Sequence, residues 1–399
     1  MTSNARSFLT SYIHRVSPLG LDPPRFRHSR RLGASILFAF LTIGGPAFSA
    51  TITVDSAADN ETGGDGLCTL REALNNANAD GQTTGGDCTA GSGTDTIEFD
   101  IAGGSPIEIE LTSVLFVTDA VVIDGTTQPG NTDACTTPIP DRPTYGLSIL
   151  GDGVTGSGPD TAIRLQADGS TLRGLNFRGF DFTTLILTAD DNTIECNFIG
   201  STADGSSVGS TFDSGSWGVS FQSAASDNTV RDNLISGKGV GIRFGGNSTG
   251  NQIQRNFIGT DRAGTAAIAN DIGVFINGDN ELGTAGNGNL ISGNTTVGVR
   301  ISGSSTVVYD NQIGTDSGGT SAVPNGLGIE ILGDANVVGS DASGRRNVIS
   351  GNTGVGVEIA GADNELAANY IGVDITGAAA LPNGSHGVTV AGSGTFIKT

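Results

Sequence analysis

Apolar residues recur at every second position in a short phrase that returns along the second half of the chain. The phrase reads Gly-Val-Ser-Phe at Gly218, Gly-Val-Phe-Ile at Gly273 and Gly-Val-Thr-Val at Gly387, with related versions between them. Alternation with a period of two is typical of a β-strand with one buried face. Each phrase therefore predicts a short strand, and further strands are predicted over Val114–Ile123 and Leu172–Phe177.

Two asparagine phrases set the spacing of these strands. Asn-Phe-Ile-Gly begins at Asn197 and Asn256, and related phrases begin at Asn311 and Asn369, so this phrase recurs after 55 to 59 residues. Between these copies, Asn-Leu-Ile-Ser-Gly or Asn-Val-Ile-Ser-Gly begins at Asn233, Asn289 and Asn347. A fixed period that contains two alternating steps indicates a solenoid with one long and one short turn per repeat.

A single short turn cannot bury its apolar face, but stacked turns can. In a stack, Val and Ile lie on Val and Ile, and each strand hydrogen-bonds its neighbour about 4.8 Å away. Consecutive strands are then parallel, so the sequence predicts an all-β fold, a single-stranded parallel β-helix. The repeated asparagine lies between inward-pointing apolar positions, as Asn256 does between Ile253 and Ile258. We expect these asparagines to turn the corner and to hydrogen-bond one another in an amide ladder rather than to bind a ligand.

The first 49 residues differ in composition from the rest of the chain. They contain six of the 18 arginines and a single acidic residue. Arg30 precedes the apolar run Leu32–Ile43, and small residues follow. This order predicts a secretory signal peptide over residues 1–49, cleaved after Ser49 or Ala50. A membrane anchor is the alternative for the same run.

The charge of the remaining chain excludes several function classes. It holds 14 basic and 40 acidic residues, a net charge near −26, whereas a nucleic-acid partner requires a basic patch. His386 is the one histidine beyond residue 49, which is too little for histidine zinc sites or for Ser-His-Asp and Cys-His catalysis. We expect no membrane span after signal cleavage, and an extracellular or cell-surface location with the periplasm as the alternative.

All four cysteines follow the predicted signal peptide, in an environment where disulfides persist. Four cysteines allow three pairings. We favour Cys68–Cys88, which closes a loop of about 21 residues and stabilises the fold by about 3 kcal/mol on the entropy model. A Cys135–Cys196 disulfide follows by elimination.

Residues 50–100 differ from the repeats and predict a cap. Thr51–Val54 alternates like a first strand, and Thr69 with Glu72 three residues later forms a capping box at the start of a helix. A solenoid needs a cover over its first turn, because an open end exposes unpaired strand edges. We expect this short helix to cover the end of a β-helix over residues 101–399, whose far end carries no visible cap. The apolar face of the helix consists of Leu70, Ala73, Leu74 and Ala77.

The cap sequence resembles a known family. Cys-Thr-Leu-Arg-Glu-Ala at Cys68–Ala73 resembles the signature of the CSLREA-domain family of exported bacterial proteins, with Thr69 in place of the family's Ser. Asp95–Phe99, Val122–Gly130 and the asparagine phrases are also similar to members of that family. The resemblance implies a right-handed parallel β-helix of the pectate-lyase-like type behind the cap. It implies no particular activity, because β-helix proteins include pectin-degrading enzymes, phage tailspikes and adhesins.

The outward position of the Gly-Val-x-Ile phrases predicts a row of side chains about 4.8 Å apart. Arg243, Phe275 and Arg300 in this row form a candidate glycan-binding surface. Glu330 and Glu358 are candidate calcium ligands, and with Arg300 they form the candidate catalytic set. A solvated face on which unlike charges pair is the alternative reading. The whole row, which we call the strip, consists of Ser220, Arg243, Phe275, Arg300, Glu330, Glu358 and Thr389.

A second outward row, which we call the stripe, is too apolar to face water. We expect the long loops of alternate turns to cover it, because an uncovered stripe would be an interaction patch. The stripe consists of Phe198, Leu234, Phe257, Leu290, Gln312, Val348 and Tyr370.

The sequence is compatible with two function classes. The favoured one is a secreted or cell-surface scaffold that binds or adheres to an extracellular polysaccharide or a cell-surface partner. The alternative is a polysaccharide lyase or glycoside hydrolase that acts from Arg300, Glu330 and Glu358, with calcium as the one candidate cofactor. A groove beside the strip would favour the enzyme, and a smooth face would favour the scaffold.

Overall fold

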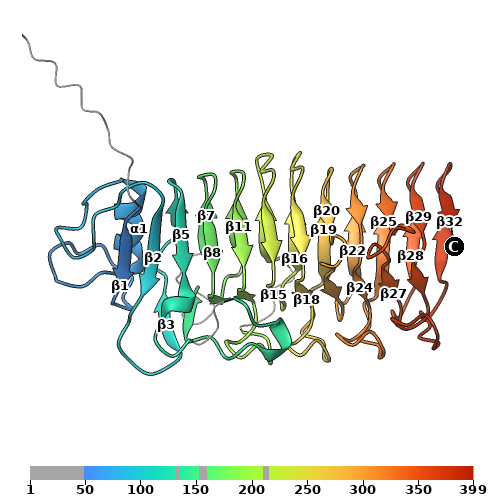
Figure 1. Ribbon diagram of the computed structural model, residues 1–399, viewed down its shortest axis with the longest axis horizontal. Coiled ribbons are helices and arrows are strands. Elements are labelled where there is room, and N and C mark those ends of the chain that lie inside the picture. Colours follow the sequence, from blue (N-terminus) through green and yellow to red (C-terminus); the bar gives the residue numbers. More distant parts are fainter. Residues whose placement is uncertain (1–48, 132–134, 152–159, 210–214, 399) are drawn as a thin grey trace, which may run out of the picture. The chain divides into compact units, whose positions relative to one another are not determined.

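The computed structural model describes residues 49–131, 135–151, 160–209 and 215–398, so the predicted signal peptide lies outside the described residues except for Ser49. Within this part, parallel strands form three sheets, and each complete turn of the solenoid adds one strand to each sheet. The turns stack in chain order, from the blue cap to the red C-terminal turns in Figure 1. The predicted parallel β-helix is confirmed.

The strands are short, because each turn bends after two to five residues. Sheet A has twelve strands: β1 (Thr51–Val54), β2 (Asp95–Phe99), β5 (Val121–Asp124), β8 (Thr171–Arg173), β11 (Thr193–Glu195), β14 (Thr229–Arg231), β17 (Gln252–Gln254), β20 (Glu281–Leu282), β23 (Val307–Val308), β26 (Val337–Val338), β29 (Glu365–Ala367) and β32 (Phe396–Lys398). Sheet B has ten: β3 (Ile107–Glu110), β6 (Leu147–Leu150), β9 (Asn176–Arg178), β12 (Phe198–Ile199), β15 (Leu234–Ile235), β18 (Phe257–Ile258), β21 (Leu290–Ile291), β24 (Gln312–Ile313), β27 (Val348–Ile349) and β30 (Tyr370–Ile371). Sheet C has ten: β4 (Leu115–Val117), β7 (Ile163–Leu165), β10 (Thr183–Leu187), β13 (Trp217–Phe221), β16 (Val240–Phe244), β19 (Ile272–Ile276), β22 (Val297–Ile301), β25 (Leu327–Ile331), β28 (Val357–Ile359) and β31 (Val388–Val390). The helices are α1 (Leu70–Asn78) and the 3-10 turns η1 (Gly125–Thr127) and η2 (Ile139–Asp141).

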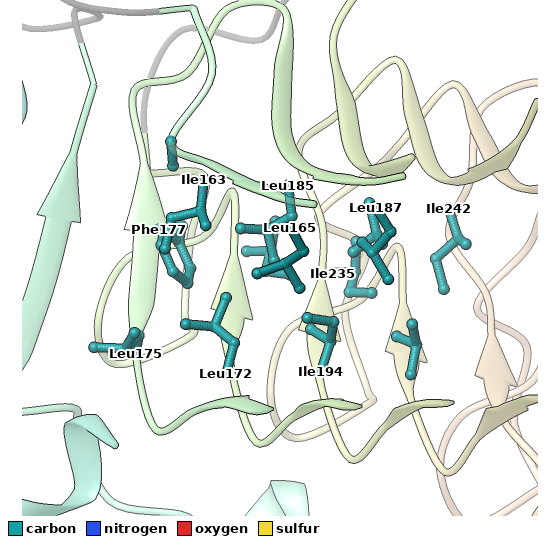
Figure 2. Close-up of a cluster of buried hydrophobic side chains, with 14 of the residues drawn as sticks. Ile163, Leu165, Leu172, Leu175, Phe177, Leu185, Leu187, Ile194, Ile235 and Ile242 are labelled. Carbon is teal, nitrogen blue, oxygen red and sulfur yellow. The ribbon is translucent and has the colours of Figure 1, made fainter. Parts of the chain in front are cut away.

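The core lies inside the three sheets. Figure 2 shows Leu172 and Ile194 of sheet A pointing toward Leu165 and Leu187 of sheet C across the interior, where all four are buried. Because the strands are in register, equivalent side chains lie on one another from turn to turn. The rings of Phe221 in β13 and Phe244 in β16, for example, stack with their centroids 4.4 Å apart. Each such buried side chain stabilises the fold by about 1.5–3 kcal/mol.

The predicted asparagine ladder is confirmed at the corner between sheets A and B. The Nδ2 of Asn256 donates to Oδ1 of Asn289 over 3.0 Å, and also to the carbonyl oxygen of Val230 over 2.8 Å. The same amide-to-amide bond joins every neighbouring pair in this ladder, which consists of Asn197, Asn233, Asn256, Asn289, Asn311, Asn347 and Asn369. A comparable ladder at the corner between sheets B and C consists of Asn270, Asn294, Asn325, Asn352 and Asn383.

The first turn contains the helix α1. Thr69 and Glu72 form the capping box of α1, and the apolar face of the helix is buried. Arg71 pairs with Asp59 at 2.8 Å and donates to the carbonyl oxygen of Ser113 over 2.7 Å, which ties the helix to the solenoid. The Cys68–Cys88 disulfide is also confirmed.

Two predicted strands are wrong in their extent. Residues 114–123 include β4 in sheet C and the start of β5 in sheet A, and do not form one strand. Residues 172–177 belong to two strands, β8 in sheet A and β9 in sheet B, and not to one. Gly174 lies between them with φ of +72°, a backbone conformation that turns the chain and that glycine adopts without strain.

Candidate functional site

The strip lies on the outward face of sheet C in the predicted register. Arg243 is paired with Phe275, and Phe275 with Arg300. Glu330 and Glu358 take the next two positions in the row. The inward neighbours of Phe275, Val274 and Ile276, are buried, so alternation along β19 holds Phe275 on the outer side, where it is partly exposed.

Two aromatic residues that sequence reasoning missed extend this face. The guanidinium of Arg243 lies 4.1 Å from the ring centre of Trp217, within the range of a cation–π contact. The Trp217 ring in turn lies 5.1 Å from that of Phe182, which is 47% exposed. Trp217 is the single tryptophan of the chain and directly precedes the Gly-Val-Ser-Phe phrase, a signal that could have drawn attention to it.

The charged end of the strip is already internally paired. Nε of Arg300 donates to a carboxylate oxygen of Glu330, while Glu358 on the next strand is exposed. Arg300, which the enzymatic hypothesis needs as a base, is therefore already in an ion pair with Glu330. Among the described residues, no group of three or more His, Cys, Asp and Glu side chains is arranged to hold a metal ion.

Loops cover part of the stripe, as expected, whereas Phe257, Gln312 and Tyr370 are partly exposed. Phe198 and Leu234 are fully buried, and Leu290 is 4% exposed. Four loops, each closed by an antiparallel bridge, fold over the stripe at residues 201–208, 260–267, 315–322 and 373–380. The glycines near the loop tips make the close approach: a Cβ on Gly264 would lie 2.7 Å from Leu290 and 2.9 Å from the ring of Phe257.

The segment 135–145 completes this cover at its N-terminal end. The ring of Tyr145 packs edge-on against Phe198 with centroids 4.6 Å apart, and its hydroxyl donates to the carbonyl oxygen of Cys196. Arg142 donates to the carbonyl oxygen of Asp232 over 2.6 Å. The segment, with Asp232, Arg255 and Phe257, lines a cavity of about 680 Å³ over sheet B.

A second cavity over sheet B, of about 510 Å³, holds a more varied set of polar groups. It is lined by Asp310, Gln312, Arg346 and Tyr370 together with apolar floor residues such as Leu290. The guanidinium of Arg346 lies 4.2 Å from the ring centre of Tyr370. We call this the Asp310 cavity. Sequence reasoning missed it, although its residues have a common signal: they stand immediately before or after a ladder asparagine.

Burial raises the pKa of Asp310, because water solvates its charged form less well there. The backbone N–H groups of Gly286 and Gly288 donate to the carboxylate and partly oppose this shift. The Asp310 backbone has φ of +63°, so a strained corner presents this carboxyl to the cavity.

The predicted Cys135–Cys196 disulfide is absent, and both cysteines are free thiols. Elimination assumes that every cysteine is paired, whereas here the two thiols share a hydrogen bond. That bond and burial raise the pKa of Cys196 and keep it protonated.

The comparisons with known proteins concern the fold alone. No known protein family and no curated protein sequence matches the chain. An alginate lyase from Paenibacillus sp. str. FPU-7 is 14% identical with a TM-score of 0.38, over 88% of this chain and 98% of the lyase. The Dettilon tailspike protein is 14% identical with a TM-score of 0.40, over 83% of this chain and 66% of the tailspike. Pectate lyase Pel9A is 13% identical with a TM-score of 0.36, over 86% and 78%.

The CSLREA resemblance therefore depends on the sequence phrases alone. In the part of the chain that the structure describes, no helix has the length and apolar character of a membrane span.

Proposed function

We propose that the outward face of sheet C binds an extended glycan and that the protein is a carbohydrate-binding scaffold. The observation that supports this is the unbroken run of Phe182, Trp217, Arg243 and Phe275 on one face. Aromatic rings offer large apolar area at low entropic cost and can lie against the C–H groups of a sugar ring. Arg243 offers several N–H donors to sugar hydroxyls or carboxylates.

Binding without turnover is the better-supported activity of this face. The two cavities described above are lined by side chains and loops over sheet B, not by the strip. Arg300 is already paired with Glu330. A lyase or hydrolase that uses Arg300, Glu330 and Glu358 with calcium remains the second outcome of the test below.

We also infer that the chain is exported, with a CSLREA-type cap and a cleaved signal peptide. The disulfide of the cap supports an oxidising compartment. Cleavage after Ser49 fits better than cleavage after Ala50, because both the N–H and the carbonyl group of Ala50 make hydrogen bonds in the folded chain. Its N–H donates to Asp95 over 2.9 Å, and its carbonyl accepts from Thr96 over 2.9 Å.

A glycan array of neutral polysaccharides and polyuronates, with calcium and with a chelator, tests the proposal. We expect at least one ligand, whose binding falls at least tenfold in Phe275→Ala and Arg243→Ala. The control is Gln254→Ala, an outward residue of sheet A. Product analysis on each ligand separates binding from cleavage. Absence of binding by the unchanged protein, or equal binding by all variants, would overturn the proposal.

A further inference from the structure

The Asp310 cavity lies over sheet B, away from the strip on sheet C. Its floor is made by stripe residues that follow one another in register, from Phe257 through Leu290 and Gln312 to Tyr370 across five strands. Steps of about 4.8 Å give this floor a length of roughly 19 Å. One side of the cavity is formed by loop residues Ser317 and Ile375, and the opposite side by the corner that holds Asp310.

Several polar groups that line this cavity can still donate hydrogen bonds to a ligand. Oε1 of Gln312 accepts from the hydroxyl of Thr315 over 3.2 Å, while its Nε2 has no partner among the described residues. Nε of Arg346 donates to the carbonyl oxygen of Ala368 over 2.8 Å, while its two terminal nitrogens have none within that same part of the chain. The cavity therefore presents an amide donor, a guanidinium edge and the Asp310 carboxyl around one space of about 510 Å³.

We propose that the Asp310 cavity is a saccharide-binding site distinct from the sheet C face, and that it takes the units of a neutral glycan. Sugar hydroxyls both donate and accept, so they can satisfy Asp310 as acceptor and Gln312 and Arg346 as donors at the same time. The apolar floor at Leu290 and Val348 matches the C–H face of a pyranose ring.

The charges of the cavity select against an acidic glycan. Arg346 is positive and Asp310 is negative, so the two side chains that line the cavity leave no excess positive charge to hold a carboxylated sugar. The chain as a whole has a net charge of −21, which adds repulsion against a polyuronate. A neutral sugar pays no such cost.

Titration of the full processed chain with tetrasaccharides of glucose, galactose, mannose and N-acetylglucosamine, and with tetragalacturonate, tests this site. We expect at least one neutral tetrasaccharide to bind. Its affinity should fall about tenfold in Gln312→Ala and in Arg346→Ala, which is the loss of about one well-made hydrogen bond to a charged or amide group. Gln312→Glu keeps the shape and removes the donor, so it should lose affinity without any change in packing.

Two controls separate this site from the sheet C face. Phe275→Ala should leave binding in the Asp310 cavity unchanged, and Gln254→Ala on sheet A should change neither site. Thermal melting verifies that each variant is folded. Loss of binding in Phe275→Ala with full retention in all three cavity variants would overturn the proposal, as would preference for tetragalacturonate or absence of binding by every neutral tetrasaccharide.

Discussion

A Cβ atom on Gly273 would lie 2.5 Å from the carbonyl oxygen of Gly298 in the next turn. The same contact recurs along sheet C: a Cβ on Gly218 would lie 2.5 Å from the oxygen of Gly241, and one on Gly328 would lie 2.4 Å from that of Gly356. The first residue of the Gly-Val-x-Ile phrase is therefore glycine for a steric reason. It lets the backbones of successive turns approach each other near the start of each strand.

Gly273→Ala should destabilise the solenoid by about 1–3 kcal/mol, because the added methyl forces neighbouring turns apart in a packed interior. Urea unfolding measures the change. Gly104→Ala is the matched control, since a Cβ there meets nothing within 4 Å, and it should stay within about 0.5 kcal/mol of the unchanged protein. Equal stability of the two variants would contradict the steric explanation.

Asn256→Ala should lower the melting temperature more than the replacement of a surface asparagine does. It removes the acceptor for the backbone N–H and the Nδ2 of Asn233, each bonded over 3.0 Å. A buried polar group left without a partner costs about 1–3 kcal/mol. Asn277→Ala is the control, because Nδ2 of Asn277 makes one bond of 3.4 Å near the surface. If both variants melt alike, the ladder contributes little to stability.

Asp310→Asn should change how stability depends on pH. The folded pKa of Asp310 is raised above its ordinary value of 3.8, so the wild-type carboxyl favours folding most below that value. This contribution is lost as pH rises through the folded pKa. The amide does not titrate, so the variant should gain stability relative to wild type as pH rises from below 3.8 through the folded pKa.

Urea unfolding across that pH range measures the difference. Asparagine also tolerates the left-handed backbone at this position. A pH profile for Asp310→Asn that is parallel to wild type would show that burial does not tune this carboxyl.

Cys135 should be alkylated before Cys196 in the native protein. The thiolate is the reactive form, and the raised pKa of Cys196 together with its burial keeps that thiol protonated and shielded. Cys135 is half-exposed. Peptide mass mapping after brief iodoacetamide treatment at about pH 8 distinguishes the two sites. Denatured protein, in which both should react, is the control, and equal native rates would contradict the prediction.

The fold and the strip could be predicted because one signal is repeated in every turn. Val274 and Val299 occupy the same place in their phrases, and stacking them fixes the register that brings Arg243 beside Phe275. Alternation did not reveal the corner at Gly174, because apolar positions continue through it from one sheet into the next. A period of two describes which face a side chain takes, not which sheet it joins.

The Asp310 cavity could not be predicted from the same signals. Its depth depends on loops 315–322 and 373–380 lying over sheet B, and their path is set by tertiary contacts rather than by a local pattern. The contact of Arg346 with the Tyr370 ring joins two adjacent turns, so it depends on how the turns stack and not on a local pattern. The cysteine pairing failed for a related reason, since counting cysteines gives no information about sulfur geometry.

The four loops lie on alternate turns, so each loop after the first hydrogen-bonds the loop two turns before it. The backbone N–H of Arg262 donates to Gly205, that of Ser317 to Gly264, and that of Ile375 to Gly319, each over 2.9 Å. Deletion of one winding would set a loop against a neighbour that has none, whereas deletion of two would restore every contact. Gene duplication and loss should therefore lengthen or shorten this protein by whole pairs of windings, and its natural size variants should differ by multiples of 55 to 59 residues.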